Sequence, residues 1–391
     1  MGVGQSTDND AARAQELLLR YGMNPDQTPA RVFVEHGSLP LVVHSGAPSY
    51  INLLDALNAW QLVQELSAAT TLPAAASFKH TAPAGAAVGL PLTPTLARAY
   101  RVPTETLSPL AAAYARARGA DRIASYGDFV AVSEPMNGST AAFLAKEASD
   151  GVIAPGYAPD ALDRLRRKKG GNYLVLEIDA AWRPEPIERR HVFGVTFEQP
   201  RNQAPVELGT VVSRRTDLSE SACRDLQIAA ITLKYTPSNS ICLAVDGQVV
   251  GVGAGQQSRI HCTRLACSKA EVWWLRQHPT VLNLQYRTGA SRAEMDNAIE
   301  AWLQGEATDV LVGNPPPLSA LERAEWLSQL HAIAMASDGL IPFRDNVDRA
   351  ARTGVEYLWQ PGGAVRDDQI IAAANEHNMV MCFSARRLFH H

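Results

Sequence analysis

The residues of this sequence best suited to chemistry are Lys79 and His80, which stand side by side within residues 77–89. The small apolar residues at 73–76 predict a buried strand, and the prolines and glycines that follow predict a loop. A base and a cation at a strand end lie where open α/β sheets bind ligands, because side chains converge on the crevice there. On these residues alone, the alternative of a solvated lysine beside a hydrogen-bonded loop histidine stays open.

A second candidate is the glycine-rich segment 253–258. Strands are predicted at 241–245 and 248–252, because the Asp246-Gly247 pair between them is typical of a tight type I′ hairpin turn. A helix is predicted to open at about Ser258, and the free amides at its start attract anions or polar rings. A glycine-rich turn by itself is a weak signal.

The chain alternates predicted strands and helices in both halves, which predicts a layered α/β fold. The triplets Lys79-His80-Thr81 and Lys234-Tyr235-Thr236 hint at an internal duplication, although three similar positions can arise by chance. We place a boundary near residue 200, giving domains at 1–200 and 201–391. A helical insertion is predicted at about 281–335, supported by two capping boxes, Ser291 with Glu294 and Ser319 with Glu322.

Several elements are expected to position these residues. Residues 17–19 are predicted to end a short helix, which leaves Arg20 and Tyr21 at the helix end. The guanidinium of Arg20 could bind a phosphate there, although a surface ion pair is favoured from that segment alone. Apolar residues recurring every three or four positions from 53 to 66 predict a helix packed on the sheet. The basic turn 166–171 is predicted to be solvated, and the chain is predicted to finish as a strand and tail at 386–391.

Composition excludes several classes of protein. The chain has 391 residues, 46% of them hydrophobic and 19% charged, as expected of a globular protein with room for two domains. No apolar run approaches the roughly 20 residues of a membrane span, and no basic stripe indicates nucleic-acid binding. The polar start lacks the features of a signal peptide, and five scattered cysteines favour reduced thiols, so a cytoplasmic location is expected.

The sequence resembles the transformylase part of the bifunctional purine-biosynthesis family that carries AICAR transformylase and IMP cyclohydrolase activities. The resemblance runs from about Arg20 to His391 and is carried by residues 52–63, 78–89, 114–121, 149–157, 253–265, 342–350 and 387–391. It implies a duplicated cytidine-deaminase-like α/β fold of three-layer domains without zinc. It also implies a homodimer whose active sites form between subunits. The zinc signature of the deaminases, His-x-Glu with Pro-Cys-x-x-Cys, is absent from the sequence.

The resemblance implies transfer of a formyl group from 10-formyltetrahydrofolate to the 5-amino group of aminoimidazole carboxamide ribonucleotide (AICAR). His80 matches the family's proton acceptor, Lys79 its transition-state stabiliser, and Asn239 a residue that orients the formyl group or carboxamide.

Binding residues carried over by position form three sets. AICAR contacts are Arg20, Tyr21, His80, Gly127, Asp150, Asn239, Arg259, Leu340 and Arg387. Contacts to the reduced folate are Ile260, Asp345, Ala364 and Val365, and a potassium site would use Thr236, Ser238, Asp338 and His390. Two positions depart from the family: Asp26 stands where the family usually has histidine, and Leu340 where it has an aromatic residue.

Because 19 residues precede Arg20, we expect no cyclohydrolase domain and a single activity, with ring closure left to a separate IMP cyclohydrolase. Three alternatives are a zinc nucleoside deaminase, a non-catalytic regulatory paralogue that binds nucleotide, and a stand-alone cyclohydrolase. Retention of both Lys79 and His80 speaks against the regulatory paralogue.

Overall fold

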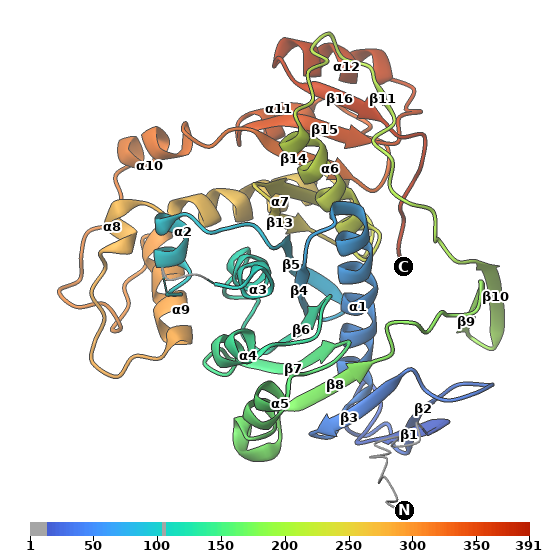
Figure 1. The fold of residues 1–391 in the computed structure, drawn as a ribbon. Helices are drawn as coiled ribbons and strands as arrows, with labels where there is room; N and C mark the ends of the chain where they lie inside the picture. The colour runs from blue at the N-terminus through green and yellow to red at the C-terminus, as the bar shows by residue number, and fades with distance from the viewer. Residues whose placement is uncertain (1–13, 104–106) are drawn as a thin grey trace, which may run out of the picture.

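The computed structural model describes residues 14–103 and 107–391, and a twelve-stranded mixed sheet forms its centre (Figure 1). The strand order is β11-β16-β15-β14-β12-β13-β5-β4-β6-β7-β8-β3. In chain order the strands are β3 (Leu41–Ser45), β4 (Ala74–Lys79), β5 (Ala82–Val88), β6 (Asp128–Val132), β7 (Ser149–Ala154), β8 (Leu174–Ile178), β11 (Thr210–Val211), β12 (Ile241–Val245), β13 (Gln248–Gly253), β14 (Ile333–Ser337), β15 (Val355–Gln360) and β16 (Val380–Phe383).

Helices cover both faces of this sheet, which makes three layers. On one face α1 (Tyr50–Thr70) and α6 (Glu220–Leu233) share a single apolar core with the strands. On the other face α3 (Pro109–Gly119) and α7 (Arg259–Leu275) form a second core. That core also takes residues from α2 (Pro94–Ala99), α4 (Gly138–Leu144), α5 (Pro159–Arg166), α11 (Asp345–Ala351) and α12 (Asp367–Glu376). The prediction of a layered α/β fold is confirmed.

The order of elements in the first half recurs in the second. In the first half, helix α1 is followed by the hairpin β4–β5, by α3, and by the three strands β6, β7 and β8, which are separated by helices. In the second half, α6 is followed by the hairpin β12–β13, by α7, and by the three strands β14, β15 and β16. The two series meet where β5 pairs with β13 through Ala87 and Gln248. Within this recurrence the His80-Thr81 turn corresponds to Asp246-Gly247. The triplet similarity was therefore a wrong indicator, because residues 234–236 follow a helix rather than a strand.

Local sequence explains several element ends. Ser49 and Asn52 form a capping box at the start of α1, and Thr93 caps α2 with Pro94 at its first position. The predicted β12–β13 turn is confirmed, since Asp246 and Gly247 both have positive φ, 49° and 78°.

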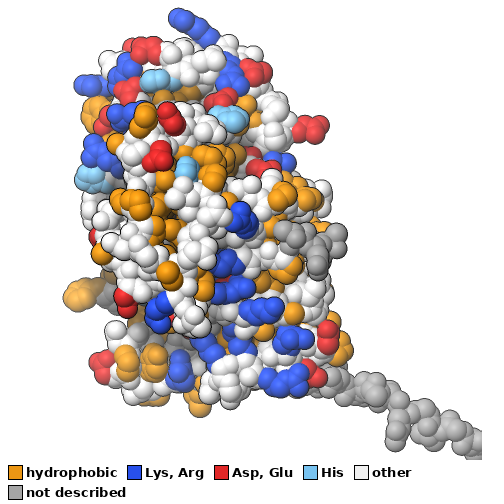
Figure 2. All heavy atoms as spheres, turned by 90° about the vertical axis from the view of Figure 1, so that its left-hand side faces the viewer, with side chains coloured by type: hydrophobic (Ala, Val, Ile, Leu, Met, Phe, Trp, Pro, Cys, Tyr) orange, Lys and Arg blue, Asp and Glu red, His pale blue; other side chains and the backbone are white. Residues whose placement is uncertain are grey.

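Three helices lie between α7 and β14: α8 (Pro279–Leu282), α9 (Arg292–Leu303) and α10 (Ala320–Leu327). They have a small core of their own, and the capping boxes predicted at Ser291 and Ser319 are both present. Figure 2 looks onto this side of the molecule, where a band of hydrophobic side chains lies above a region rich in Lys and Arg.

The predicted helix end at residues 17–19 is wrong. Glu16–Leu19 is strand β1, paired antiparallel with β2 (Ala30–Phe33) in a separate two-stranded sheet. A four-residue apolar run takes its conformation from its pairing partner, and that partner lies eleven residues further along.

The predicted loop after Thr81 is also wrong, because Ala82–Val88 is strand β5 despite Pro83 and Gly85. Proline has no N–H to donate to a neighbouring strand. It is tolerated at position 83 because the described pairing of β5 with β13 is at Ala87, four residues away. A Cβ at Gly85 would lie 2.2 Å from the Ala117 carbonyl oxygen, so glycine lets α3 pack closely on the strand.

Two smaller expectations, the strand at 386–391 and the solvated basic turn at 166–171, also differ from the structure. Residues 386–391 contain no strand, since the last strand is β16. The proline- and charge-rich segment around residues 183–205 includes a hairpin, β9 (Ile187–Val192) with β10 (Val195–Pro200). The basic turn is more than solvated, because Lys168 Nζ donates to the carbonyls of Leu144, Ala145 and Glu147 at the end of α4. Of the described helices, none is both long and apolar enough to span a bilayer.

Candidate active site

Lys79 and His80 lie at the tip of the β4–β5 hairpin. Lys79 is the last residue of β4, and its Nζ donates a hydrogen bond of 2.7 Å to the carbonyl of Tyr126. His80 and Thr81 form the two-residue turn, both with positive φ, 54° and 61°. Left-handed backbone at two residues other than glycine is uncommon and clusters at functional sites. The imidazole of His80 is exposed, so it is free to meet a ligand.

Gly127 and Asp150 lie beside this tip. Gly127 precedes β6 and has a φ of 75°, and a Cβ built on it would lie 3.6 Å from Asp150 Oδ2. Asp150, in β7, forms an ion pair of 2.9 Å with Lys169. We call Lys79, His80, Gly127 and Asp150 the hairpin cluster.

Arg20 and Tyr21 lie on the loop after β1, where the Arg20 guanidinium stacks 5.2 Å from the Tyr21 ring centroid. The Arg20 amide donates to the Pro48 carbonyl just before α1. Among the described residues, no hydrogen bond or ion pair joins these two side chains to Lys79 or His80.

Four other predicted AICAR contacts line one cavity of about 810 Å³: Asn239, Arg259, Leu340 and Arg387. The rest of its lining comes from Gln257, Ser258, Pro342, Pro361, Gly362, Gly363, Ala385 and Phe389. We call this the arginine cavity. The start of α7 opens at it, and Ser258 makes no side-chain cap, so the first amides of that helix favour an anion.

Arg259 is the buried charge of the arginine cavity. Its guanidinium donates to Asp338 Oδ1, to Asn239 Oδ1 at 2.8 Å and to Ser337 Oγ at 3.0 Å. Asp338 is fully buried, so this ion pair balances its charge. Asn239 Nδ2 donates in turn to the carbonyls of Gln256 and Gln257, which fixes the orientation of the amide.

The residues predicted to hold potassium lie behind Arg259. Ser238 Oγ donates to Asp338 Oδ2 and accepts from the His390 amide, and the Ser238 amide donates to the His390 carbonyl. Thr236 Oγ1 instead donates to Thr232 O in α6. Carboxylate, hydroxyl and carbonyl oxygens suit a hard cation, so the donor set fits the chemistry of potassium. No group of three or more His, Cys, Asp and Glu side chains suited to a metal occurs in the described part of the chain.

The predicted folate contacts lie on segments that continue from the cavity wall. Ile260 follows Arg259 in α7, and Asp345 opens α11 three residues after Pro342. Ala364 and Val365 follow the lining residue Gly363, and Val365 is exposed.

The hairpin cluster and the arginine cavity lie at one edge of the sheet. β4 ends and β12 begins at this edge, because β4, β5, β13 and β12 are successively antiparallel. β5 and β13 separate them, and the described residues that line the cavity include neither Lys79 nor His80. Within one chain, the predicted proton acceptor His80 and the two arginines of the cavity, Arg259 and Arg387, therefore stand in different places.

A family model described as the AICARFT/IMPCHase bienzyme matches residues 4–269, more than half of the chain. The chain belongs to this family. The bifunctional purine biosynthesis protein PurH of Acidithiobacillus ferrooxidans is 32% identical over 387 residues, which cover 97% of this chain and 59% of that protein. PurH proteins of Sorangium cellulosum and Magnetococcus marinus are also 32% identical and cover 95% of this chain. This chain thus spans 58–59% of the length of these curated relatives.

Within the range matched by the AICARFT/IMPCHase family model lie the whole hairpin cluster, Asn239 and Arg259. Leu340 and Arg387 lie beyond it.

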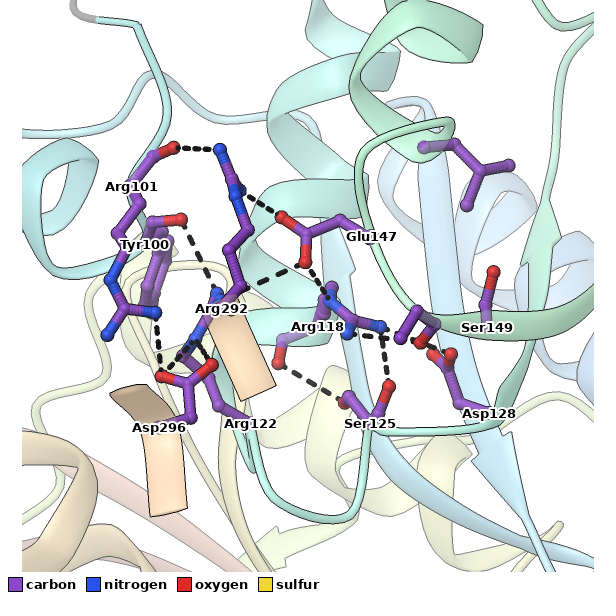
Figure 3. A network of polar contacts seen from close by, with 12 residues as sticks. Tyr100, Arg101, Arg118, Arg122, Ser125, Asp128, Glu147, Ser149, Arg292 and Asp296 are labelled. Carbon is purple, nitrogen blue, oxygen red and sulfur yellow. Dashed lines mark hydrogen bonds and ion pairs between the residues drawn. The ribbon is translucent and has the colours of Figure 1, made fainter. Parts of the chain in front are cut away.

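The sequence reasoning missed a buried network of charges that ends at Asp128, the residue after Gly127 (Figure 3). Arg118, in α3, donates to Glu147 at 3.1 Å and to Asp128 at 3.1 Å, and Asp128 accepts from Ser77 Oγ at 2.6 Å. Burial raises the pKa of Asp128 to about 6 against the opposing effect of Arg118. Arg292, in α9, pairs with Glu147, so the network ties the inserted helices to the strand that follows Gly127.

Sequence reasoning also missed Asp55, which lies in α1 among buried apolar residues and is 6% exposed. The one sequence signal that could have identified Asp55 is its position as a charged residue on the buried side of a predicted helix.

Proposed function

We propose that this chain transfers the formyl group of 10-formyltetrahydrofolate to the 5-amino group of AICAR, releasing tetrahydrofolate and the formylated nucleotide (FAICAR). The observation that carries the proposal is the hairpin tip, which presents an exposed imidazole next to an ammonium group in a chain of the AICARFT/IMPCHase family. We confine the proposal to formyl transfer because the resemblance from Arg20 to His391 concerns the transformylase part.

The chemistry asks for a base and a cation. The AICAR amine is a poor nucleophile, since its lone pair is delocalised into the imidazole and the carboxamide. His80 accepts its proton as the new C–N bond to the formyl carbon forms. Lys79 stabilises the oxyanion, and the proton ends on the folate nitrogen when its bond to the formyl carbon breaks. Asn239 orients the formyl group or the carboxamide.

The arginine cavity suits the nucleotide phosphate. Arg259 and Arg387 supply guanidinium groups, and the open start of α7 adds backbone amides. The folate would lie on Ile260, Asp345, Ala364 and Val365. Potassium, if bound, would be held by oxygens of Ser238, Asp338 and His390, where it would fix the loop before Asn239.

We further propose a homodimer in which the hairpin cluster of one protomer completes the arginine cavity of its partner. The separation of the two clusters within one chain supports this. The β9–β10 hairpin, which extends from the body of the molecule in Figure 1, also favours it. The hairpin exposes Phe193, Val195 and Phe197, and an isolated two-stranded hairpin is marginally stable in water without a partner surface. The recurring order of elements supports the duplicated cytidine-deaminase-like fold that we propose with this assembly.

The direct test follows tetrahydrofolate release by absorbance from purified protein given AICAR and 10-formyltetrahydrofolate. Wild-type turnover that vanishes in both Lys79→Ala and His80→Ala supports the proposal. A folded protein that binds AICAR without turnover contradicts it and favours the regulatory paralogue. Zinc bound in stoichiometric amount would instead favour a deaminase. FAICAR is expected to accumulate, and IMP in its place would show that ring closure is not left to a separate cyclohydrolase.

The dimer proposal has its own test. Inactive His80→Ala and Asn239→Ala proteins are mixed, allowed to exchange subunits, and assayed. Random pairing makes half of the dimers mixed, each with one intact site, so about one quarter of wild-type activity should return. No recovery, with subunit exchange verified, would contradict a site shared between protomers.

A further inference from the structure

Asp55 approaches the hairpin tip from the helix layer beneath it. Its Oδ1 accepts a hydrogen bond of 2.7 Å from the Thr81 amide. In a two-residue turn this amide has no partner within the hairpin, and the left-handed conformations of His80 and Thr81 need to be held. The Asp55 carboxylate therefore fixes the turn that carries His80.

The second half of the chain contains a counterpart of Asp55, Asp225, which holds a hairpin turn that carries no histidine. Asp225 is the sixth residue of α6, as Asp55 is of α1, and it accepts from the amides of both Asp246 and Gly247 at 2.8 Å. A carboxylate that caps the hairpin turn is thus common to both halves. Asp225 has an ion pair of 3.1 Å with Arg224, and its turn carries no histidine.

The charge of Asp55 has no such balance. Among the described residues no Lys or Arg pairs with it, and burial raises the pKa of its carboxyl to about 6. The charged groups around it are His80 in the turn, Asp128 in β6 and Asp150 in β7; of these, His80 alone favours the ionised form. Asp128 is paired with Arg118, and Asp150 with Lys169. Turn capping requires only an acceptor, so the negative charge itself calls for another explanation.

We propose that Asp55 is the positioning residue of His80: it fixes the turn through the Thr81 amide, and its negative charge stabilises the imidazolium that His80 becomes on accepting the amine proton. This inference rests on the proposed formyl transfer. The aspartate takes no proton; it orients the base and lowers the energy of its protonated form, as carboxylates do for catalytic histidines elsewhere.

The test compares Asp55→Asn with Asp225→Asn in the full chain. Asparagine keeps an acceptor for the turn amide and removes only the charge. For Asp55→Asn we expect kcat to fall about ten- to a hundredfold, within the range of general base catalysis, with little change in the KM for AICAR. The acidic limb of the pH–rate profile should move to lower pH, because His80 loses its stabilising neighbour. Asp225→Asn should leave kcat and this limb at their wild-type values.

Unfolding by urea separates function from folding. At pH 8 Asp55→Asn should be at least as stable as wild type, since it no longer buries an unbalanced charge. Wild-type kcat in Asp55→Asn, or a fall in kcat that only mirrors lost stability, would overturn the inference. The pKa of the Asp55 carboxyl, measured by NMR on wild type and His80→Ala, keeps the two proposals distinguishable. A higher Asp55 pKa in His80→Ala supports the Asp55–His80 pairing even if the wild type transfers no formyl group, and an unchanged Asp55 pKa refutes the pairing.

Discussion

Replacing Asp296 by alanine removes the carboxylate that holds the inserted helix α9 against the rest of the chain. Asp296 is 4% exposed and accepts from Arg101 at 3.0 Å, Arg122 at 3.0 Å and Arg276 at 2.5 Å. Its loss would leave three guanidinium groups facing one another, two of them buried. Breaking a buried ion pair by removing one partner costs about 3–5 kcal/mol, and we expect Asp296→Ala to lose stability in that range at pH 7.

The pH dependence gives a second measure of the same interaction. Burial alone would raise the pKa of the Asp296 carboxyl, but Arg122, Arg276 and Arg101 outweigh it and lower the pKa from 3.8 to about 2. A carboxyl whose pKa is depressed on folding contributes stability above its unfolded value, and this contribution is lost as the pH falls from about 4 to about 2. The shift corresponds to about 2 kcal/mol at neutral pH.

The assay is urea unfolding followed by circular dichroism at one protein concentration, at pH 7 and near pH 3. Asp296→Asn preserves the shape of the side chain, and Asp26→Ala changes an exposed loop carboxylate as the control. The difference between wild type and Asp296→Ala should shrink toward pH 3. A variant within about 0.5 kcal/mol of wild type at pH 7, as for ordinary surface substitutions, would refute the reasoning. A difference that does not change with pH would assign the loss to packing instead of charge.

Three further predictions follow from single contacts. Arg387 is exposed and lines the arginine cavity, so Arg387→Ala should raise the KM for AICAR about tenfold or more by removing a charged hydrogen bond. The melting temperature should not change. An unchanged KM in steady-state assays would show that Arg387 does not bind the phosphate. Gly85→Ala should lower the melting temperature by several degrees in calorimetry, because the new methyl group would meet the Ala117 carbonyl at 2.2 Å; an unaltered melting temperature would show that α3 can shift. Burial lowers the pKa of Lys168 from 10.5 to about 8 in the folded protein. Between pH 8 and about 10.5 the unfolded chain therefore binds one more proton than the folded protein, and the wild type should become more stable as the pH rises through this range. Lys168→Met should lack this gain in urea unfolding, and an equal gain in the variant would mean that other groups cause it.

The sequence allowed prediction where a feature is decided by residues close together. The turn at Asp246-Gly247 and the capping boxes at Ser291 and Ser319 depend on side chains within three positions of one another. Prediction failed where a distant partner decides. Strand β1 is set by β2, and Pro83 is accepted in β5 because of how β13 pairs.

The same distinction applies to the candidate site. Lys79 and His80 stand out because they are adjacent, whereas the carboxylate of Asp55 meets the Thr81 amide 26 positions along the chain. Asn239 and Arg387 share a cavity although 148 positions separate them, and only the resemblance, not their spacing, suggested that they act together. Whether these residues bind AICAR stays a prediction.

The most direct test of the central claim is transfer of isotopically labelled formyl from 10-formyltetrahydrofolate into AICAR by the purified wild-type chain, with the nucleotide product identified by mass spectrometry. The proposed formyl transfer predicts more moles of labelled FAICAR than moles of enzyme, formed at the same rate as tetrahydrofolate. No labelled FAICAR should form with His80→Ala. Unlabelled AICAR recovered intact from folded wild-type protein that binds both ligands would contradict it.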